Sequence, residues 1–232
     1  MTASDGRVAM GRPLPLVLLH GWGFDASVWD SVRELLADWP IHVVDAGYFG
    51  HPSMPCLPES YVAVGHSLGA MRCLAETGPG CRGWVLINGF ARFSAAADFP
   101  EGVPVRVIDR MLMRLAADPA AVVDDFRKRC GAPAQAPASG LDGAALAEDL
   151  RRLRDEDARG AWTARQVPAC VLAGEADPVV APTMTRASFG EDVGWCAGGG
   201  HLLPLTHAAW CAARIRAFAN ALAGSSAGVA SA

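Results

Sequence analysis

Residues 62–70, VAVGHSLGA, decide how this chain is expected to fold. The apolar run that starts at Tyr61 predicts a strand, and the pattern after Ser67 predicts a helix. Gly65 and Gly69 flank the serine as G-x-S-x-G, which between a strand and a helix is the tight turn called a nucleophile elbow. An ordinary glycine-bounded turn is the alternative interpretation. The strand before the motif and the helix after it favour the elbow, in which Ser67 presents a nucleophilic hydroxyl.

Short apolar runs and helical patterns alternate along most of the chain. Six runs are apolar almost throughout, as strands covered on both faces must be; they are 14–19, 41–44, 61–65, 84–87, 169–173 and 193–196. The helical patterns cover 27–37, 67–76 and 204–222. This alternation predicts the α/β class, with a mostly parallel central sheet of about six strands and helices on both faces.

Residues 91–161 interrupt the alternation. They offer helix starts at Asp118 and Asp142 but no strand, and the segment 130–140, CGAPAQAPASG, is typical of a linker. A helical insertion between two parallel strands is expected over the carboxyl edge of the sheet, where ligands bind in such folds. We therefore predict a core formed by 1–90 and 162–223, a helical lid insertion at 91–161 and a disordered tail at 224–232.

Composition and charge exclude several classes of protein. The formal net charge of -4 does not favour nucleic acid or an anionic membrane as the main partner. Seven cysteines without a C-x-x-C pair are typical of reduced thiols rather than of a disulfide framework or a zinc site. Residues 1–12 lack the apolar segment of a signal peptide, and no apolar run reaches the length of a membrane span. We expect a cytoplasmic protein that is a monomer.

A nucleophilic serine needs a base, and the base needs an acid that orients it. Asp177 follows the predicted strand 169–173, and His201 lies in a glycine-rich loop after the last predicted strand. The order serine, aspartate, histidine and the positions at strand ends favour a catalytic triad over isolated turn residues. The competing acids are Glu175 and Asp192, and the competing histidines are His51, His66 and His207.

Acyl transfer also needs hydrogen-bond donors for an oxyanion. The elbow supplies the backbone N–H of Leu68, and the loop 20–23, HGWG, supplies that of Trp22 after the first strand. A tight turn without a chemical role is the alternative interpretation of this loop.

Four short motifs together resemble the α/β-hydrolase superfamily over nearly the whole chain; they are HGWG at 20–23, GHSLG at 65–69, GEAD at 174–177 and GH at 200–201. Three longer stretches are similar to a narrower group, the biotin-pathway esterases that demethylate pimeloyl-[acyl-carrier protein] methyl ester. These stretches are LLHGWGFDASVW at 18–29, LINGFARFSAAADFP at 86–100 and DPAAVVDDFRKRCGAP at 118–133.

The resemblance implies a serine carboxylesterase. In it Ser67 would be the nucleophile, His201 the general base and acid, and Asp177 the acid that orients the histidine. Trp22 and Leu68 would form the oxyanion hole, and substrate contacts are expected from Trp22, Leu68 and Phe126. Packing of the lid onto the body is the more frequent role of an apolar lid residue such as Phe126. The resemblance implies no cofactor and no metal.

The resemblance also implies a partner, an acyl-carrier protein that presents the substrate. Such a carrier is acidic and would dock on basic lid residues, of which Arg127, Arg129, Arg151 and Arg152 are the candidates. Residues 105–160 contain ten basic and ten acidic side chains, so solvated helix faces are an equal alternative.

Two other functions stay open at this level. The first is a small-molecule carboxylesterase, thioesterase or lactonase that has the same triad and meets no carrier. The second is a non-catalytic binding module that keeps the fold, against which the presence of Ser67, Asp177 and His201 argues.

Overall fold

A single sheet organises the molecule. The computed structural model describes residues 13–132 and 140–227, and in this part six strands pair in the order β2-β1-β3-β4-β5-β6, all in parallel. The strands are β1 (Leu16–Leu19), β2 (Ile41–Val44), β3 (Tyr61–His66), β4 (Cys81–Ile87), β5 (Ala169–Gly174) and β6 (Gly194–Cys196). The helices are η1 (Ala26–Trp29, a 3-10 turn), α1 (Asp30–Leu35), α2 (Leu68–Glu76), α3 (Val105–Ala117), α4 (Pro119–Arg129), α5 (Gly143–Asp155), α6 (Arg159–Thr163), α7 (Pro182–Phe189), α8 (Leu203–Thr206) and α9 (Ala208–Ala227).

Helices cover both faces of the sheet, which explains why its strands are apolar almost throughout. Alternate residues of a strand point to opposite faces. In β1, Leu16 and Leu18 belong to the core shared with α1 and α9, whereas Val17 and Leu19 belong to the core shared with α2. The prediction of an α/β fold with a parallel sheet of six strands is confirmed.

The predicted elements agree with the observed ones, with shifts at their ends. Each predicted strand is present with bounds within three residues of those expected. The predicted helix 27–37 is divided into η1 and α1, and the predicted helix 204–222 is divided at His207 into α8 and α9.

The last helix continues beyond the predicted end of the core. α9 runs to Ala227, so residues 224–227, which we expected in a disordered tail, are helical. Alanine is the strongest helix former and recurs through 217–227, which favours continuation across the glycine and serines there. The rest of the predicted tail, 228–232, lies outside the described residues. Neither α9 nor any other helix in the described ranges has the length and apolar character needed to cross a bilayer.

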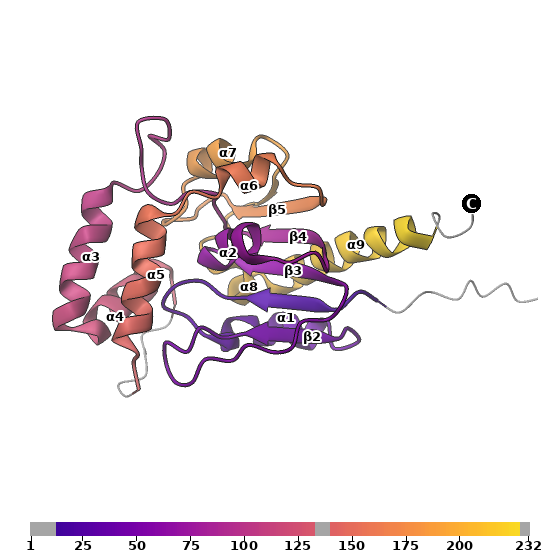
Figure 1. Ribbon diagram of the computed structural model, residues 1–232, viewed down its shortest axis with the longest axis horizontal. Helices are drawn as coiled ribbons and strands as arrows, with labels where there is room; N and C mark the ends of the chain where they lie inside the picture. Colours follow the sequence, from indigo (N-terminus) through magenta and orange to yellow (C-terminus); the bar gives the residue numbers. More distant parts are fainter. Residues whose placement is uncertain (1–12, 133–139, 228–232) are drawn as a thin grey trace, which may run out of the picture.

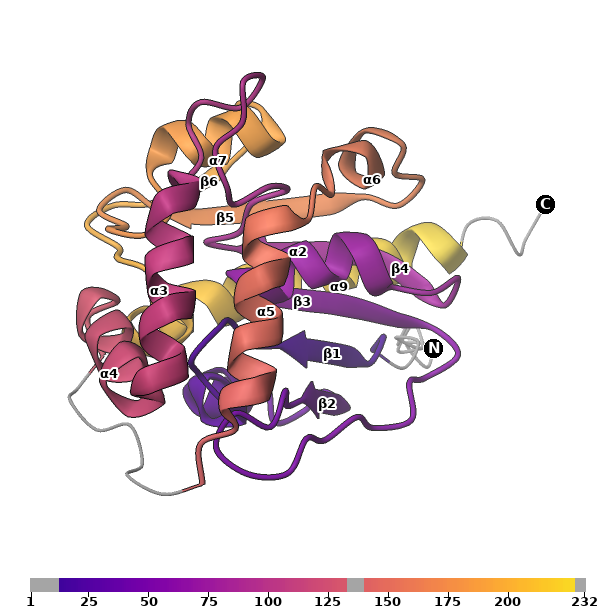
Figure 2. The same ribbon diagram turned by 60° about the vertical axis from the view of Figure 1, so that its left-hand side comes forward.

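Of the four helices described between β4 and β5, three, which we call the inserted helices (α3, α4 and α5), lie beyond the carboxyl ends of the strands (Figures 1 and 2). α4 begins where predicted because the Asp118 carboxylate accepts the N–H of Ala121 at 3.0 Å. α5 begins after Asp142, whose carboxylate accepts two N–H groups of the first turn at 2.9 and 3.0 Å. The central part of the predicted linker, 133–139, lies outside the described residues.

Candidate active site

Ser67 occupies a sharp turn between β3 and α2. Its backbone has φ 55° and ψ -120°, a conformation that residues with a side chain rarely adopt. The flanking glycines allow the turn because of close backbone approaches: a Cβ on Gly65 would lie 2.4 Å from the carbonyl oxygen of Gly69, and one on Gly69 would lie 2.2 Å from that of Leu19. This is the geometry of a nucleophile elbow.

The side chains of Ser67, His201 and Asp177 form one hydrogen-bonded chain. His201 Nε2 lies 3.1 Å from Ser67 Oγ, and His201 Nδ1 lies 2.8 Å from Asp177 Oδ2. Because a carboxylate only accepts, Nδ1 carries the proton and leaves Nε2 free to accept the serine proton. All three residues are buried, with 5%, 0% and 7% of their surface exposed in the order serine, histidine, aspartate.

Asp177 remains ionised although it is buried. Burial would raise the pKa of this carboxyl, but the charge and hydrogen bond of His201, with donors on Val180 and Asn88, hold its pKa below the ordinary value. Asp177 Oδ1 accepts the N–H groups of Val179 and Val180 at 2.7 and 2.9 Å. The carboxylate is therefore positioned to stabilise a positive charge on the imidazole.

Asn88 also takes part in this site, and the sequence interpretation missed it. It comes directly after β4, and its Nδ2 donates to Asp177 Oδ2 and, at 3.1 Å, to the carbonyl oxygen of Gly200. The available signal was an Asn-Gly pair at the carboxyl end of a predicted strand, the edge at which the other site residues meet.

The competing residues do not take the positions of the acid or the base. Glu175 and Asp192 are exposed, and so is His51. His207 forms a hydrogen bond with its neighbour Thr206 through Nδ1 at 2.9 Å.

His66 has a different role in the site. It is wholly buried, and its Nε2 lies 2.8 Å from the backbone carbonyl oxygen of His201, to which it donates. Burial, and after it the charge of His201, lowers the pKa of His66 to about 3, so this ring is neutral.

The expected oxyanion loop lies against the elbow. A Cβ on Gly21 would approach Ser67 Cβ to 2.9 Å, so the backbone of 20–23 passes next to the serine. Leu68 is the first residue of α2, and the first N–H groups of a helix have no acceptor within it. The role of the Trp22 and Leu68 amides as oxyanion donors stays a prediction.

The indole of Trp22 connects the oxyanion loop to an inserted helix. Its Nε1 donates to the carbonyl oxygen of Leu146 in α5 at 2.9 Å. Its ring meets that of Phe126 of α4 edge to face, with centroids 5.0 Å apart, and the Phe126 ring lies 6.5 Å from that of His201. Phe126 therefore both packs α4 onto the body and lies beside the candidate base, while the substrate contacts of Trp22, Leu68 and Phe126 stay predictions.

Two of the four arginines that we expect to dock a carrier, both on α4, donate to backbone carbonyl oxygens of the body, and their docking role stays a prediction. Arg127 Nη1 donates to the carbonyl oxygen of Gly23 at 3.2 Å, and its guanidinium lies 4.9 Å from the centroid of the Phe24 ring. Arg129 donates to the carbonyl oxygen of Pro178 through Nε and Nη2 at 3.3 and 3.1 Å. These bonds tie α4 to the loops that carry Trp22 and Asp177.

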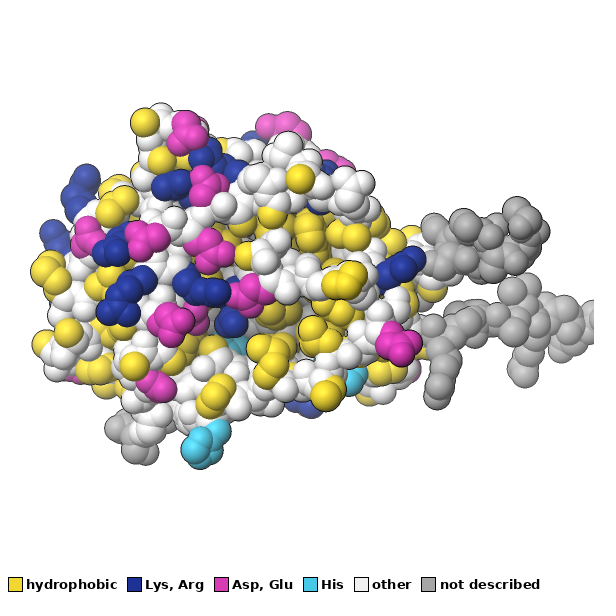
Figure 3. All heavy atoms as spheres, in the orientation of Figure 1, with side chains coloured by type: hydrophobic (Ala, Val, Ile, Leu, Met, Phe, Trp, Pro, Cys, Tyr) yellow, Lys and Arg dark blue, Asp and Glu magenta, His cyan; other side chains and the backbone are white. Residues whose placement is uncertain are grey.

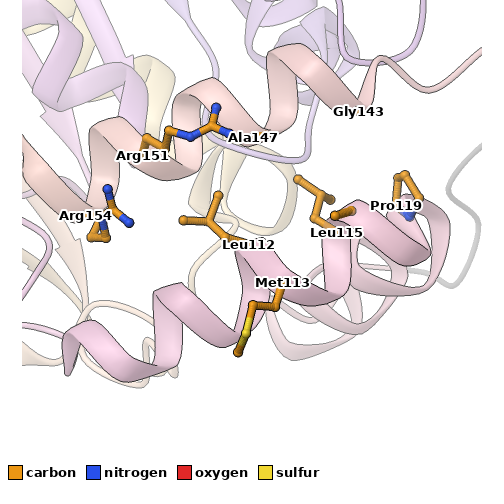
Figure 4. A pocket seen from close by; sticks show the side chains of 9 residues that line it. Leu112, Met113, Leu115, Pro119, Gly143, Ala147, Arg151 and Arg154 are labelled. Carbon is orange, nitrogen blue, oxygen red and sulfur yellow. The ribbon is translucent and has the colours of Figure 1, made fainter.

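The other two docking candidates, on α5, differ in their partners. Arg152 pairs with Glu76 of α2 and is engaged in the body. Arg151 is exposed, and no carboxylate lies within 4 Å of it among the described residues. It borders a groove of about 500 Å³ between α3 and α5 (Figure 4), lined by Leu112, Met113, Leu115, Ala116, Pro119, Gly143, Ala147, Arg151 and Arg154.

The surface of the inserted helices carries both signs of charge. Figure 3 shows Lys and Arg side chains intermingled with Asp and Glu on this part of the molecule. Arg154, at the groove, is neutralised by Asp109 at 3.2 Å and Asp155 at 2.8 Å. Among the docking candidates in the described residues, Arg152 alone pairs with carboxylates, Arg127 and Arg129 donate to backbone carbonyl oxygens, and Arg151 has neither kind of partner.

A known protein aligns with nearly the whole length of this chain. No protein-family model matches the chain. The relative is the pimeloyl-[acyl-carrier protein] methyl ester esterase of Stenotrophomonas maltophilia (strain K279a), which is 30% identical to this chain. The alignment has 254 positions and covers 91% of the chain and 95% of the relative.

Solved structures show the same fold. A bromoperoxidase from Bacillus anthracis superposes with a TM-score of 0.73 at 20% identity, covering 90% of this chain and 92% of that one. An esterase from Exiguobacterium antarcticum superposes with a TM-score of 0.73 at 15% identity and the same coverage.

Proposed function

The chain belongs to the family of pimeloyl-[acyl-carrier protein] methyl ester esterases and is a carboxylic ester hydrolase of the α/β-hydrolase fold, and we propose that it demethylates a carrier-bound pimeloyl methyl ester with Ser67 as nucleophile. The product would be the free ω-carboxyl group that biotin synthesis uses. The observation that supports this most is the hydrogen-bonded chain from Ser67 through His201 to Asp177 at a nucleophile elbow.

The first half of the reaction forms an acyl-enzyme. His201 Nε2 takes the proton of Ser67 as Oγ attacks the carbonyl carbon of the methyl ester. The oxygen that becomes negative is stabilised by the N–H groups of Trp22 and Leu68, and Asp177 stabilises the imidazolium. Collapse of the tetrahedral intermediate breaks the bond to the methoxy oxygen, which takes the proton from His201 and leaves as methanol.

The second half releases the acid. Water donates a proton to His201 Nε2 and attacks the acyl carbon, which again places negative charge on the carbonyl oxygen. Collapse breaks the bond to Ser67 Oγ, which takes the proton back from His201. The pimeloyl group leaves with a free carboxylate at its ω end and stays attached to its carrier at the other end.

The inserted helices act as a lid over this site. The support for this is the contact of Phe126 with the rings of Trp22 and His201 and the bond from Trp22 Nε1 to Leu146. The carrier docks on α5, where Arg151 is exposed next to the apolar groove and has no carboxylate partner among the described residues. An acidic carrier would meet a positive charge there without having to break an existing ion pair.

A small-molecule esterase, thioesterase or lactonase is the second candidate function. What favours it is that Arg127, Arg129 and Arg152 are already engaged with the body, and that 105–160 has a net charge of zero. With this function the groove on α3 and α5 would meet no partner during turnover.

Salt and one charge reversal distinguish the two candidates. We would measure kcat/KM for the carrier-bound methyl ester and for dimethyl pimelate as sodium chloride rises from 0.1 to 1 M, over which the Debye length falls from about 10 to about 3 Å. The proposal predicts a steep loss for the carrier-bound ester alone. At low salt, Arg151→Glu should lower kcat/KM for the carrier-bound ester alone. The matched control is Arg82→Glu, which should not, because Arg82 is exposed at the amino end of β4, away from the site. Equal responses of both substrates would favour the small-molecule function.

A further inference from the structure

We infer that Asn88 is a positioning residue of the site: its amide holds Asp177 and the loop of His201 in the arrangement that activates Ser67. The inference rests on the proposed triad but not on the proposed substrate. Neither the G-x-S-x-G motif nor the aspartate and histidine motifs include this residue.

One amide group joins two separate segments of the site. Asn88 Nδ2 donates to Asp177 Oδ2, the same oxygen that accepts from His201 Nδ1 at 2.8 Å, and also to the carbonyl oxygen of Gly200 at 3.1 Å. The backbone N–H of Asn88 donates to the carbonyl oxygen of Leu172 in β5 at 2.8 Å, so the end of β4 fixes the side chain. Asn88 is fully buried.

The backbone at Asn88 is held in an unusual conformation. Among the described residues it is one of two non-glycine positions with positive φ, at 48°, and the other is Ser67 at 55°. Asparagine tolerates this left-handed region better than most residues, and glycine adopts it without cost. Backbone strain of this kind gathers at functional sites, where the surrounding structure maintains it. Here the strained residue carries the side chain that bridges the acid and the histidine loop.

The two hydrogen bonds fix both partners of the imidazole. Asp177 Oδ1 is held by backbone N–H groups, so without Asn88 its Oδ2 would keep His201 as its single side-chain donor. The histidine loop is held at two successive carbonyl groups, at Gly200 by Asn88 and at His201 by His66. Removal of the Asn88 amide takes one hydrogen bond from Asp177 Oδ2 and one from the Gly200 carbonyl together, so the imidazole is oriented less firmly.

The first test removes the amide and keeps the backbone. Asn88→Gly accepts the positive φ, and Ser188→Ala is the matched control, because it removes a buried hydroxyl of α7 that has no hydrogen-bond partner among the described residues. With a short chromogenic ester, kcat of Asn88→Gly should fall about 10- to 100-fold with KM unchanged, the range expected for a hydrogen bond to a charged group. Labelling of Ser67 by a fluorophosphonate should slow by the same factor. The inference would be overturned if Asn88→Gly, with kcat calculated per fluorophosphonate-labelled Ser67, had the kcat of the wild type, or if KM alone changed.

The second test makes the bond depend on pH. In Asn88→Asp the new carboxyl can donate to Asp177 only while it carries a proton, and two facing carboxyl groups resist joint ionisation. The other titratable groups facing Asp177 are His201, the neutral His66 and the buried Cys130 thiol. The kcat of Asn88→Asp should therefore fall with rising pH where that of the wild type does not.

The outcomes separate this inference from the proposed function. A kcat profile of Asn88→Asp parallel to that of the wild type would refute the role of the donor. If Ser67→Ala abolishes hydrolysis of the chromogenic ester while Asn88→Gly is fully active, the inference fails and the triad stands. If Ser67→Ala retains activity, the proposed nucleophile itself is wrong.

Discussion

The buried hydrogen bond between Tyr48 and Asp149 joins the body to α5, and its removal should lower the free energy of unfolding. Tyr48 Oη donates to the Asp149 carboxylate, and the two residues are 1% and 8% exposed. Burial and the charge of Asp149 raise the pKa of Tyr48 well above its ordinary value, so the hydroxyl stays protonated and donates. In Tyr48→Phe the buried carboxylate would retain Arg152 Nε at 3.9 Å. A hydrogen bond to a charged group contributes about 1.5–3 kcal/mol, so we expect a loss of about 2 kcal/mol in the free energy of unfolding.

The chain supplies its own control, since it contains only two tyrosines. Tyr61 is 2% exposed, but its hydroxyl has no hydrogen-bond partner among the described residues. Tyr61→Phe removes the same oxygen without breaking a bond and should change stability by less than about 0.5 kcal/mol, or stabilise the fold. Urea unfolding followed by tryptophan fluorescence gives the free energy of unfolding of both variants. In thermal unfolding, Tyr48→Phe should lower Tm by about 4–8 °C. Equal stability of the two variants would refute the reasoning.

Three further predictions concern the site itself. Asp177→Asn should lower kcat for a short ester by about 10⁴-fold, because the imidazole of His201 loses its orientation. Substitution of the exposed Glu175 by Gln should leave kcat unchanged. Steady-state kinetics that showed the reverse would contradict the choice of acid. The pKa of His66 is about 3 in the folded protein against about 6.5 in the unfolded chain, so the unfolded state takes up a proton first as pH falls. The free energy of unfolding should then decrease by about 1.4 kcal/mol per pH unit between about pH 5.5 and 4, and an equal slope in His66→Gln, measured by urea unfolding, would count against this. Gly69→Ala places a Cβ against a backbone oxygen 2.2 Å away and should unfold the elbow, whereas Gly78→Ala meets open space and should melt as the wild type does.

The sheet and the three side chains of the proposed triad were accessible from sequence for the same reason. Strands covered on both faces are apolar almost throughout, so each one is evident locally, and parallel strands bring their carboxyl ends to one edge. Residues within a few positions after such strands, among them Ser67 and Asp177, therefore come together whatever the exact length of each strand. Asn88 likewise follows a strand, β4, but an asparagine before a glycine is typical of ordinary turns.

The contacts of the inserted helices could not be predicted in this way. The pairs Tyr48–Asp149 and Arg127–Gly23 join residues about a hundred positions apart, and neither side has a local pattern that identifies its partner. Arginine spacing predicts which helix carries a charge but not whether the guanidinium faces solvent or a backbone carbonyl. Arg129 is therefore placed against the body by tertiary packing alone.

The central claim, hydrolysis of a carrier-bound methyl ester by Ser67, is tested most directly by mass spectrometry of the carrier. Pimeloyl-[acyl-carrier protein] methyl ester would be incubated with the wild-type enzyme and, in parallel, with Ser67→Ala. We expect that the wild type alone reduces the mass of the acylated carrier by one CH2 unit, the replacement of a methyl group by hydrogen. An unchanged carrier mass, from wild-type protein that still hydrolyses a short chromogenic ester, would contradict the proposed substrate.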